Sequence, residues 1–161
     1  MAVDLALAKQ HLRVDHSDED ALIAQYLAAA IAWVENYTSK KLTRGAVTQE
    51  LDCFTRYLPL YWGPNPASLT VTYLDTDDAE QAVTNATIVG SRAFADWPTK
   101  QENTPITLDY TAGYTDVPAD LDSAVLLLVG EFYDNREAGE ASPAVSMAVE
   151  GLCRPYRSLR L

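Results

Sequence analysis

The stretch YTAGYTDVPADL, residues 110–121, joins two segments with different hydrophobic periods. Before it, apolar and polar residues alternate from Ile106 to Tyr110, which predicts a strand with one buried face. After it, apolar residues recur every three or four positions, which predicts a helix. Gly113 permits a sharp chain reversal, and Pro118 is preset for the first turn of a helix. The stretch is therefore predicted to be a corner between a strand and a helix, not a catalytic loop.

The helix predicted after this corner is apolar almost all round. Leu126 and Leu127 lie off its main apolar face, which is made of Leu121, Ala124, Val125, Leu128, Val129 and Phe132. A helix without a polar face has to be covered on every side by other parts of the protein. We therefore expect it to be the buried centre of the domain, and Pro143 to open a last short helix after it.

Two further helices are predicted before residue 45. The first spans residues 4–13, with Asp4 as its cap. In the second, Ser17 or Asp18 is expected to accept the free amide hydrogens. This helix is expected to end near Thr38 to Leu42, with Gly45 as its stop. Its alanines, at positions 28–30 and 32, would let a neighbouring helix approach closely. Its apolar stripe consists of Leu22, Ile23, Tyr26, Leu27, Ala30, Ile31, Val34 and Tyr37.

The middle of the chain is predicted to form antiparallel strands. The segments VTQELDCF, YLPLYWG, LTVTYLD, ATIVGS and PITLDYTA are rich in β-branched and aromatic residues, with turn-forming sequences at 63–66, 75–80 and 99–103. The predicted fold class is α+β: mainly a helical bundle around a buried central helix, with an inserted antiparallel β subdomain. We expect a single domain over residues 1–161, helical at 1–44 and 114–161 and β-rich at 45–113.

The charge of the chain is distributed unevenly. The net charge is −11, yet the last eleven residues, GLCRPYRSLRL, carry three arginines and no acid. An acidic protein of this kind is not expected to grip nucleic acid, whereas its basic tail is expected to dock to an acidic partner or to another copy. No targeting segment or membrane-spanning helix is predicted.

Catalytic, cofactor-binding and metal sites have no positive sequence signal. The acidic run from Asp75 to Glu80 lacks the glycine and glutamate that a calcium loop requires, so we expect a solvated hairpin turn. His11 and His16 do not share a helix face as two metal ligands would. The two cysteines, Cys53 and Cys153, are expected to be free thiols. We therefore predict no catalytic residue, no cofactor and no metal ion.

The aromatic residues near the prolines leave two interpretations open. Tyr61, Trp62 and Trp97 either belong to the core or form a ligand platform or subunit contact. A carboxylate- or metal-dependent hydrolase, suggested only by the acid clusters, also stays open.

Two long stretches resemble the head-tail connector (adaptor) proteins of tailed bacteriophages and gene transfer agents. They are LAKQHLRVDHSDEDALIAQYLAAAIAWVENYTSKKL at 7–42 and PITLDYTAGYTDVPADLDSAVLLLVGEFYDNRE at 105–137, and the final RPYR resembles the family pattern too. They cover about half of the chain, whereas the middle matches only in character. The residues that carry the family motifs are Leu12, Arg13, Tyr37, Tyr110, Gly113, Tyr114, Pro118, Tyr133 and Arg136.

The resemblance implies a structural virion protein and not an enzyme. Such proteins are made in the host cytoplasm and form a ring, usually dodecameric, in the neck under the portal protein. The ring extends the DNA channel, offers a surface for a stopper or tail-completion protein, and lets DNA pass without sequence-specific binding. The alternative to a ring-forming connector among binding proteins is a monomeric adaptor module. No contact with a membrane is expected.

The resemblance also implies that the carboxyl-terminal segment docks onto the portal. The residues expected to make this contact are Arg154, Tyr156, Arg157, Leu159, Arg160 and Leu161. Removing residues 152–161 is expected to leave the fold intact but to abolish docking.

Overall fold

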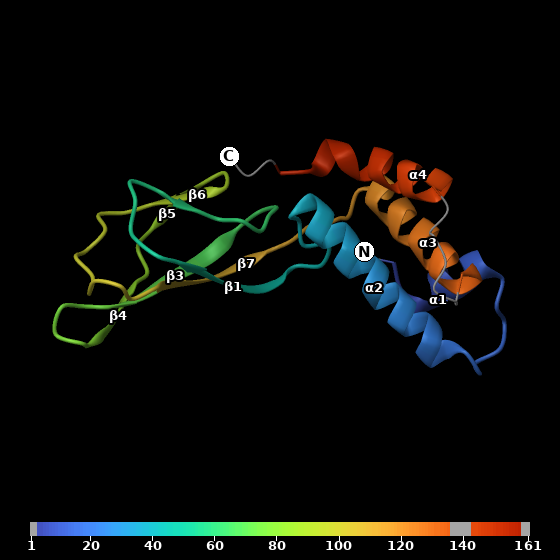
Figure 1. The fold of residues 1–161 in the computed structure, drawn as a ribbon, viewed down its shortest axis with the longest axis horizontal. Coiled ribbons are helices and arrows are strands. Elements are labelled where there is room, and N and C mark those ends of the chain that lie inside the picture. The colour runs from blue at the N-terminus through green and yellow to red at the C-terminus, as the bar shows by residue number, and fades with distance from the viewer. Residues whose placement is uncertain (1–2, 136–142, 159–161) are drawn as a thin grey trace. The chain divides into compact units, whose positions relative to one another are not determined.

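The computed structural model describes residues 3–135 and 143–158, which form two compact units (Figure 1). The helical unit is built from the chain up to Thr43 and from Thr115 onward, and the β unit is Arg44–Tyr114. The mixed α+β class is thereby confirmed. The expectation that residues 1–161 make up a single domain stays a prediction.

The helical unit contains four helices, α1 (Leu5–Leu12), α2 (Asp20–Thr38), α3 (Ala119–Asp134) and α4 (Pro143–Cys153), followed by a 3-10 turn at Arg154–Tyr156. Helix α3 contacts each of the other three helices, and α4 lies along it (Figure 1). The apolar side chains of these elements are buried together, as their helical spacing predicts. They are Ala8, Ile23, Leu27, Ala30, Val34, Leu121, Ala124, Val125, Leu128, Val129, Val149 and Cys153.

The first helix begins and ends as its sequence indicates. The Asp4 carboxylate accepts the backbone N–H of Leu7 at 2.8 Å, so the predicted cap is confirmed. Arg13 follows the helix with a φ of 58°, and its N–H bonds back to the Gln10 carbonyl at 3.2 Å. This left-handed residue ends the helix and turns the chain toward α2.

The predicted caps of the second helix are wrong. Helix α2 begins at Asp20, with Glu19 at the N-cap position and no side-chain capping bond. The residues expected to cap it, Ser17 and Asp18, lie in a preceding turn. In this turn the Asp20 N–H donates to the Ser17 carbonyl at 3.2 Å. A backbone carbonyl therefore accepts the free amide hydrogen that a side chain was expected to accept.

The predicted end of the second helix near Thr38 to Leu42 is confirmed, because α2 ends at Thr38, but Gly45 is not the residue that stops it. Ser39 adopts the left-handed conformation with a φ of 55°, and the Glu35 carboxylate then accepts the N–H of Leu42 at 2.8 Å. The same carboxylate pairs with Lys41 at 2.8 Å. These bonds fold the chain back on the end of the helix, and Gly45 becomes the first residue of a strand.

The β unit consists of two antiparallel sheets. The larger has the strand order β1 (Gly45–Leu51), β7 (Ile106–Ala112), β3 (Ala67–Leu74) and β4 (Glu80–Val83). The smaller has the order β2 (Leu58–Pro59), β6 (Arg92–Phe94) and β5 (Thr87–Val89). Strands β4 and β6 were not predicted, because each is short and lacks a clear alternation. The shared core is Val47, Leu58, Leu60, Leu69, Val71, Ala93, Ile106, Leu108, Tyr110 and Ala112.

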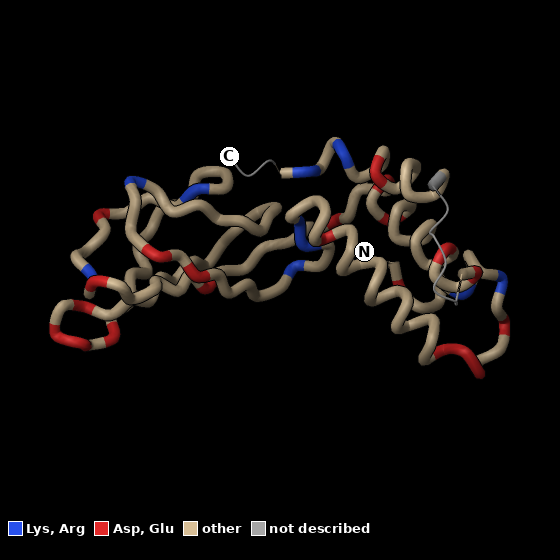
Figure 2. The backbone as a smooth tube through the Cα atoms, in the orientation of Figure 1, with Lys and Arg blue, Asp and Glu red and all other residues tan. Residues whose placement is uncertain are grey.

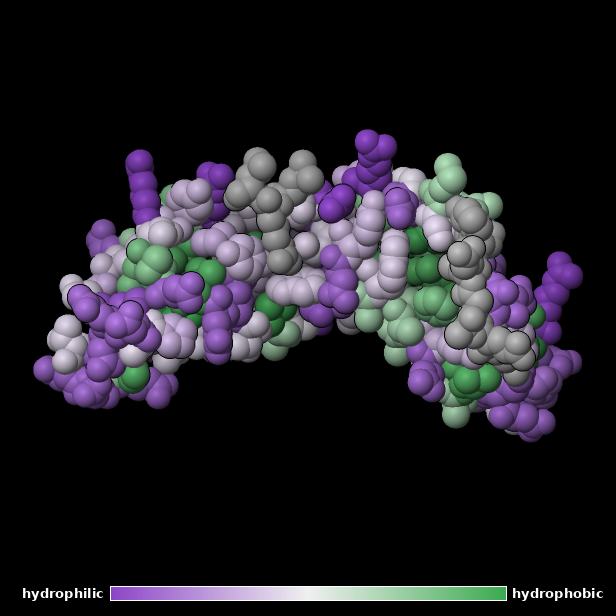
Figure 3. Space-filling view, viewed as in Figure 1, coloured by the Kyte–Doolittle hydropathy of each residue, from purple (hydrophilic) through white to green (hydrophobic). Residues whose placement is uncertain are grey.

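The predicted alternation of buried and polar residues is confirmed in the two central strands. Strand β7 buries Ile106, Leu108 and Tyr110, and strand β3 buries Leu69 and Val71. The predicted turn between β3 and β4 is a run of acidic residues at the end of their hairpin (Figure 2). On the face that Figure 3 shows, hydrophilic side chains predominate, and apolar areas interrupt them on both units.

The corner at residues 110–121 is confirmed. Gly113 has a φ of +138°, which favours glycine, and its N–H donates to the Pro64 carbonyl at 2.8 Å. Helix α3 begins at Ala119, so Pro118 occupies the N-cap position, one residue before the first turn in which it was expected. Among the described residues, no helix has the length and apolarity needed to cross a bilayer.

Candidate docking surfaces

The described part of the carboxyl-terminal tail lies along its own helical unit. The Ser158 N–H donates to the Thr38 carbonyl at the end of α2, at 3.1 Å. The half-buried Tyr156 donates its hydroxyl to the Asp120 carboxylate at 3.1 Å, and this hydrogen bond raises the pKa of Tyr156. The Arg157 guanidinium lies 5.3 Å from the centre of the Tyr37 ring. These contacts attach residues 156–158 to the helical unit.

Three of the residues expected to bind the portal are placed by these contacts, and three are not. Arg154 and Arg157 are exposed, whereas Tyr156 is engaged with Asp120. The remaining three, Leu159, Arg160 and Leu161, lie outside the described residues. The expectation that removing residues 152–161 leaves the fold intact stays a prediction, and the full burial of Cys153 at the end of α4 argues against it. Truncation at this point would remove core packing as well as the tail.

The tail and α4 form a groove with the end of α2. Its volume is about 390 Å³, and it is lined by Tyr37, Met147, Glu150, Gly151, Arg154 and Arg157. The Tyr37 ring stacks on Trp33 with 5.0 Å between centroids, while Met147 is 75% exposed. Arginine, methionine and aromatic side chains are enriched where proteins contact one another. This groove, called here the tail groove, is suited to an apolar segment that carries negative charge.

The sequence analysis missed Met147, Glu150 and Gly151 as parts of this surface. A signal for them exists, because positions 147, 150, 151 and 154 have the i, i+3, i+4, i+7 spacing of one helix face. The sequence alone does not show that this helix face is a docking surface. The groove also needs Tyr37, which belongs to a helix more than a hundred residues earlier in the chain.

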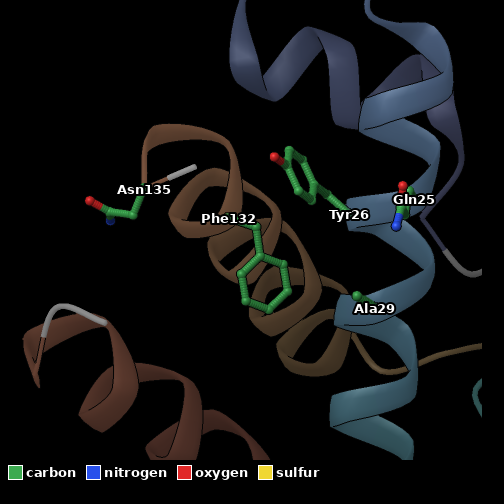
Figure 4. A pocket seen from close by; sticks show the side chains of 5 residues that line it. All are labelled: Gln25, Tyr26, Ala29, Phe132 and Asn135. Carbon is green, nitrogen blue, oxygen red and sulfur yellow. The ribbon is translucent and has the colours of Figure 1, made fainter. Parts of the chain in front are cut away.

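A second groove lies between α2 and α3. It has a volume of about 310 Å³ and is lined by Gln25, Tyr26, Ala29, Phe132 and Asn135 (Figure 4). The Tyr26 and Phe132 rings meet with 6.2 Å between their centroids. The groove borders an exposed face of α2 without any charged side chain, consisting of Ala21, Ala24, Gln25, Ala28, Ala29, Ala32 and Asn36. The alanines expected to admit a neighbour are therefore exposed, except Ala30, which is buried in the core.

The family-motif residues of the helical unit hold its helices together. Leu12 and Arg13 end α1, and the Tyr133 hydroxyl donates to the Glu19 carboxylate, which joins the end of α3 to the start of α2. Tyr37 lines the tail groove. Arg136 lies outside the described residues. The expectation that the motif residues have structural roles stays a prediction.

The family-motif residues of the β unit support the corner. The Tyr110 hydroxyl donates to the Gln49 side-chain oxygen at 3.1 Å and accepts the Trp62 N–H at 3.0 Å. Gly113 makes the reversal, and Tyr114 is half-buried beside it. Sequence reasoning missed Gln49, a buried polar residue whose partners lie far along the chain.

Of the three aromatic residues with two possible interpretations, two lie in the core and one lies at the surface. Trp62 and Trp97 pack against the β core, and Trp97 stacks on Phe54 with 5.4 Å between their centroids. Tyr61 is 37% exposed. The core interpretation therefore holds for both tryptophans.

The acidic run at the β3–β4 turn is built as a turn. The Asp75 carboxylate accepts the N–H groups of Ala79 at 3.0 Å and Asp77 at 2.9 Å. These bonds, the one from Ala79 first, lower the pKa of Asp75. Within residues 3–135 and 143–158, no three His, Cys, Asp or Glu side chains gather as metal ligands would.

The amino-terminal part of the chain matches a known protein family. Residues 2–68 match the family model described as phage gp6-like head-tail connector protein. The resemblance to head-tail connectors drawn from the sequence is thereby confirmed. The match spans α1, α2, β1 and β2 and ends at the start of β3. A search of the curated proteins finds no match.

Solved structures resemble this connector-like chain over nearly its whole length. A chain from the neck of an empty gene transfer agent particle, computed with C6 symmetry, is 27% identical with a TM-score of 0.84. A chain from the virion of a native gene transfer agent particle is 28% identical with a TM-score of 0.81. A chain from the neck of a native particle, computed with C12 symmetry, is 27% identical with a TM-score of 0.80. Each comparison covers 99% of this chain and 91% of the other. These relatives are structural neck and virion proteins, not enzymes.

Proposed function

We propose that this chain is a subunit of a head-tail connector ring in the neck of a phage or gene transfer agent particle. The observation that carries the proposal is the likeness to a neck chain with a TM-score of 0.84 over 99% of this chain. Particle necks computed with C6 and C12 symmetry contain such chains, which supports a dodecameric ring. In this ring the helical unit is a bundle around α3, and the β unit is an insertion in the same domain.

The ring docks on the portal protein through the carboxyl-terminal tail. Arg154 and Arg157 are exposed and line the tail groove, and Leu159, Arg160 and Leu161 follow directly in sequence. Two guanidinium groups beside Tyr37 and Met147 would bind an acidic and apolar portal segment. The β unit offers its loops to a stopper or tail-completion protein.

The ring also extends the channel through which DNA passes. The net charge of −11 would repel the phosphates, so that DNA slides through without sequence-specific contacts. The hydrolase interpretation rests on acid clusters alone. In the most prominent of them, the Asp75 carboxylate is occupied by the backbone N–H groups of its own turn.

Imaging the chain with its portal tests the proposal. The full-length chain and the portal protein of the same particle are mixed, and the complex is examined by negative-stain electron microscopy and native mass spectrometry. We expect a ring of this chain stacked on the portal ring, with twelve copies as the C12 symmetry of the similar neck would give. A chain that stays monomeric and indifferent to the portal would contradict the connector assignment and favour a monomeric adaptor.

A further inference from the structure

The outer face of the small sheet is unusually apolar for a surface exposed to solvent. Leu58, Ala93 and Ile88 stand opposite one another in the register, and the first two are completely buried, so this row faces the core. The neighbouring row, Pro59, Arg92 and Val89, therefore lies on the opposite face. Antiparallel sheets normally present polar side chains on that side.

This face also carries the exposed Thr87 opposite Phe94. Five of its other residues are called here the outer β patch: Tyr57, Pro59, Val89, Arg92 and Phe94. Val89 is 61% exposed and Tyr57 is 37% exposed. The Tyr57 ring meets Phe94 with 6.0 Å between their centroids. An exposed apolar patch that includes aromatic residues is typical of a protein contact.

Arg92 gives the outer β patch a positive charge. Its guanidinium carbon lies 4.5 Å from the centre of the Tyr57 ring, which fixes the group above the aromatic face. Within the described part of the chain, Arg92 has no carboxylate partner. The patch thus combines an ordered cation with apolar surface, and a fitting partner must supply carboxylates beside small or apolar side chains.

The same unit carries a segment with that chemistry. Residues 75–83, called here the acidic arm, comprise the β3–β4 turn and strand β4 (Figure 2). Glu80, Gln81 and Ala82 are exposed on both faces of the strand, and β4 is an edge strand of its sheet. Asp77 and Glu80 are exposed and have no side-chain partner among the described residues.

We infer that the outer β patch of one copy receives the acidic arm of a neighbouring copy. A ring requires each subunit to present two different, complementary surfaces. The patch and the arm are different segments, and their charges are opposite. The inference rests on the proposed ring and names one of the contacts that would close it, in addition to the uncharged face of α2.

Charge reversal and its compensation test the contact. The variants are Arg92→Glu, the pair Asp77→Arg and Glu80→Arg, and the combination of all three substitutions. Self-association of the full-length chain is measured by sedimentation velocity at low salt. We expect each of the first two variants to raise the dissociation constant about tenfold, and the combination to restore it to about the wild-type value.

A matched control has the same change in net charge at other exposed positions of the β unit. Asp52→Arg with Asp96→Arg should leave the dissociation constant unchanged. Wild-type chains that do not associate, variants that associate like the wild type, or a combination that fails to restore association would each overturn the inference.

Photo-crosslinking identifies the occupant directly. The variant Val89→p-benzoyl-phenylalanine is mixed with 15N-labelled wild-type chain, irradiated, and the crosslinked peptides are identified by mass spectrometry. Crosslinks from Val89 to residues 75–83 of the labelled copy are expected, and crosslinks to any other segment would refute the contact. A neck ring that forms normally with Arg92→Glu refutes this inference alone, whereas a chain that forms no ring with its portal refutes the proposed function.

Discussion

At the scale of single residues, one buried hydrogen-bond network holds the β unit together. Gln49 donates its amide to the Pro59 carbonyl at 2.7 Å and accepts the Tyr61 N–H at 2.9 Å, as well as the Tyr110 hydroxyl. Tyr110 in turn accepts the Trp62 N–H. The network joins β1, β2 with the segment after it, and β7. Because these groups are buried or half-buried, each lost bond leaves a polar atom without a partner.

Tyr110→Phe is expected to destabilise the β unit by about 1–3 kcal/mol, because the buried Gln49 oxygen and the Trp62 N–H both lose a partner. The measurement is urea-induced unfolding followed by tryptophan fluorescence. Tyr73→Phe is the matched control, since Tyr73 is half-buried against the same core and its hydroxyl makes no hydrogen bond within the described chain. Equal stabilities of the two variants would show that the network contributes nothing.

The sequence could not reveal this network. Gln49 was one polar residue in the strand segment VTQELDCF, and alternation alone could not show why it is buried. Its partners are separated from it by 10, 12 and 61 positions, so the bonds exist only after the sheets have formed. Tyr110 was identified as a motif residue, but its hydroxyl contacts were not.

At the scale of elements, local patterns predicted the helices α1 to α4 and the long strands. The hydrophobic period identified α1, α2, α3 and α4, and alternation identified β3 and β7. The errors occur where backbone bonds replace side-chain caps, as at Ser17, and where a side chain of the helix itself binds the chain that follows, as Glu35 does after α2 in place of the stop expected at Gly45. Strands of three or four residues, such as β4 and β6, depend on pairing with neighbours and not on their own pattern.

Helix α4 is anchored by Val149 and Cys153, which are both fully buried. Burial raises the pKa of the Cys153 thiol to about 11 from its ordinary value of 9.0. As the pH rises, the Cys153 thiol loses its proton at a lower pH in the unfolded chain than in the folded protein. The contribution of the buried neutral thiol to the free energy of unfolding is therefore fully present below pH 9.0 and is lost as the pH rises through about 11. We expect the free energy of unfolding to fall by about 2 kcal/mol over this interval because of Cys153.

Urea titrations between about pH 8 and about pH 11 test this element. Cys153→Ala keeps the pH dependence of every other group but loses the part that comes from the thiol. If the free energy of unfolding of the wild-type chain falls with pH no more steeply than that of Cys153→Ala, the thiol is not buried in its neutral form. In the folded protein, a thiol reagent should modify the exposed Cys53 and leave Cys153 unmodified until the chain unfolds.

At the scale of the whole molecule, the carboxyl-terminal tail differs in charge from the rest of the chain, because the last eleven residues carry three arginines and no acid. The sequence predicted the separation of charge, but it suggested a tail that could be removed without affecting the fold. The structure shows instead that residues 153–158 belong to the helical unit, through Cys153, the Tyr156–Asp120 bond and the Ser158–Thr38 bond. A test of docking must therefore change exposed charges and keep these anchors.

Arg154→Glu combined with Arg157→Glu meets this requirement, because both side chains are exposed. If the tail groove binds an acidic portal segment, the reversed charges repel it. We expect an unchanged melting temperature, portal binding weakened by about a hundredfold, and DNA-filled heads without tails in cells that assemble the particle. Arg44→Glu with Arg56→Glu changes the net charge equally at exposed positions of the β unit and should leave docking intact. Tailed, infectious or gene-transferring particles built with the tail variant would show that portal docking does not depend on these arginines.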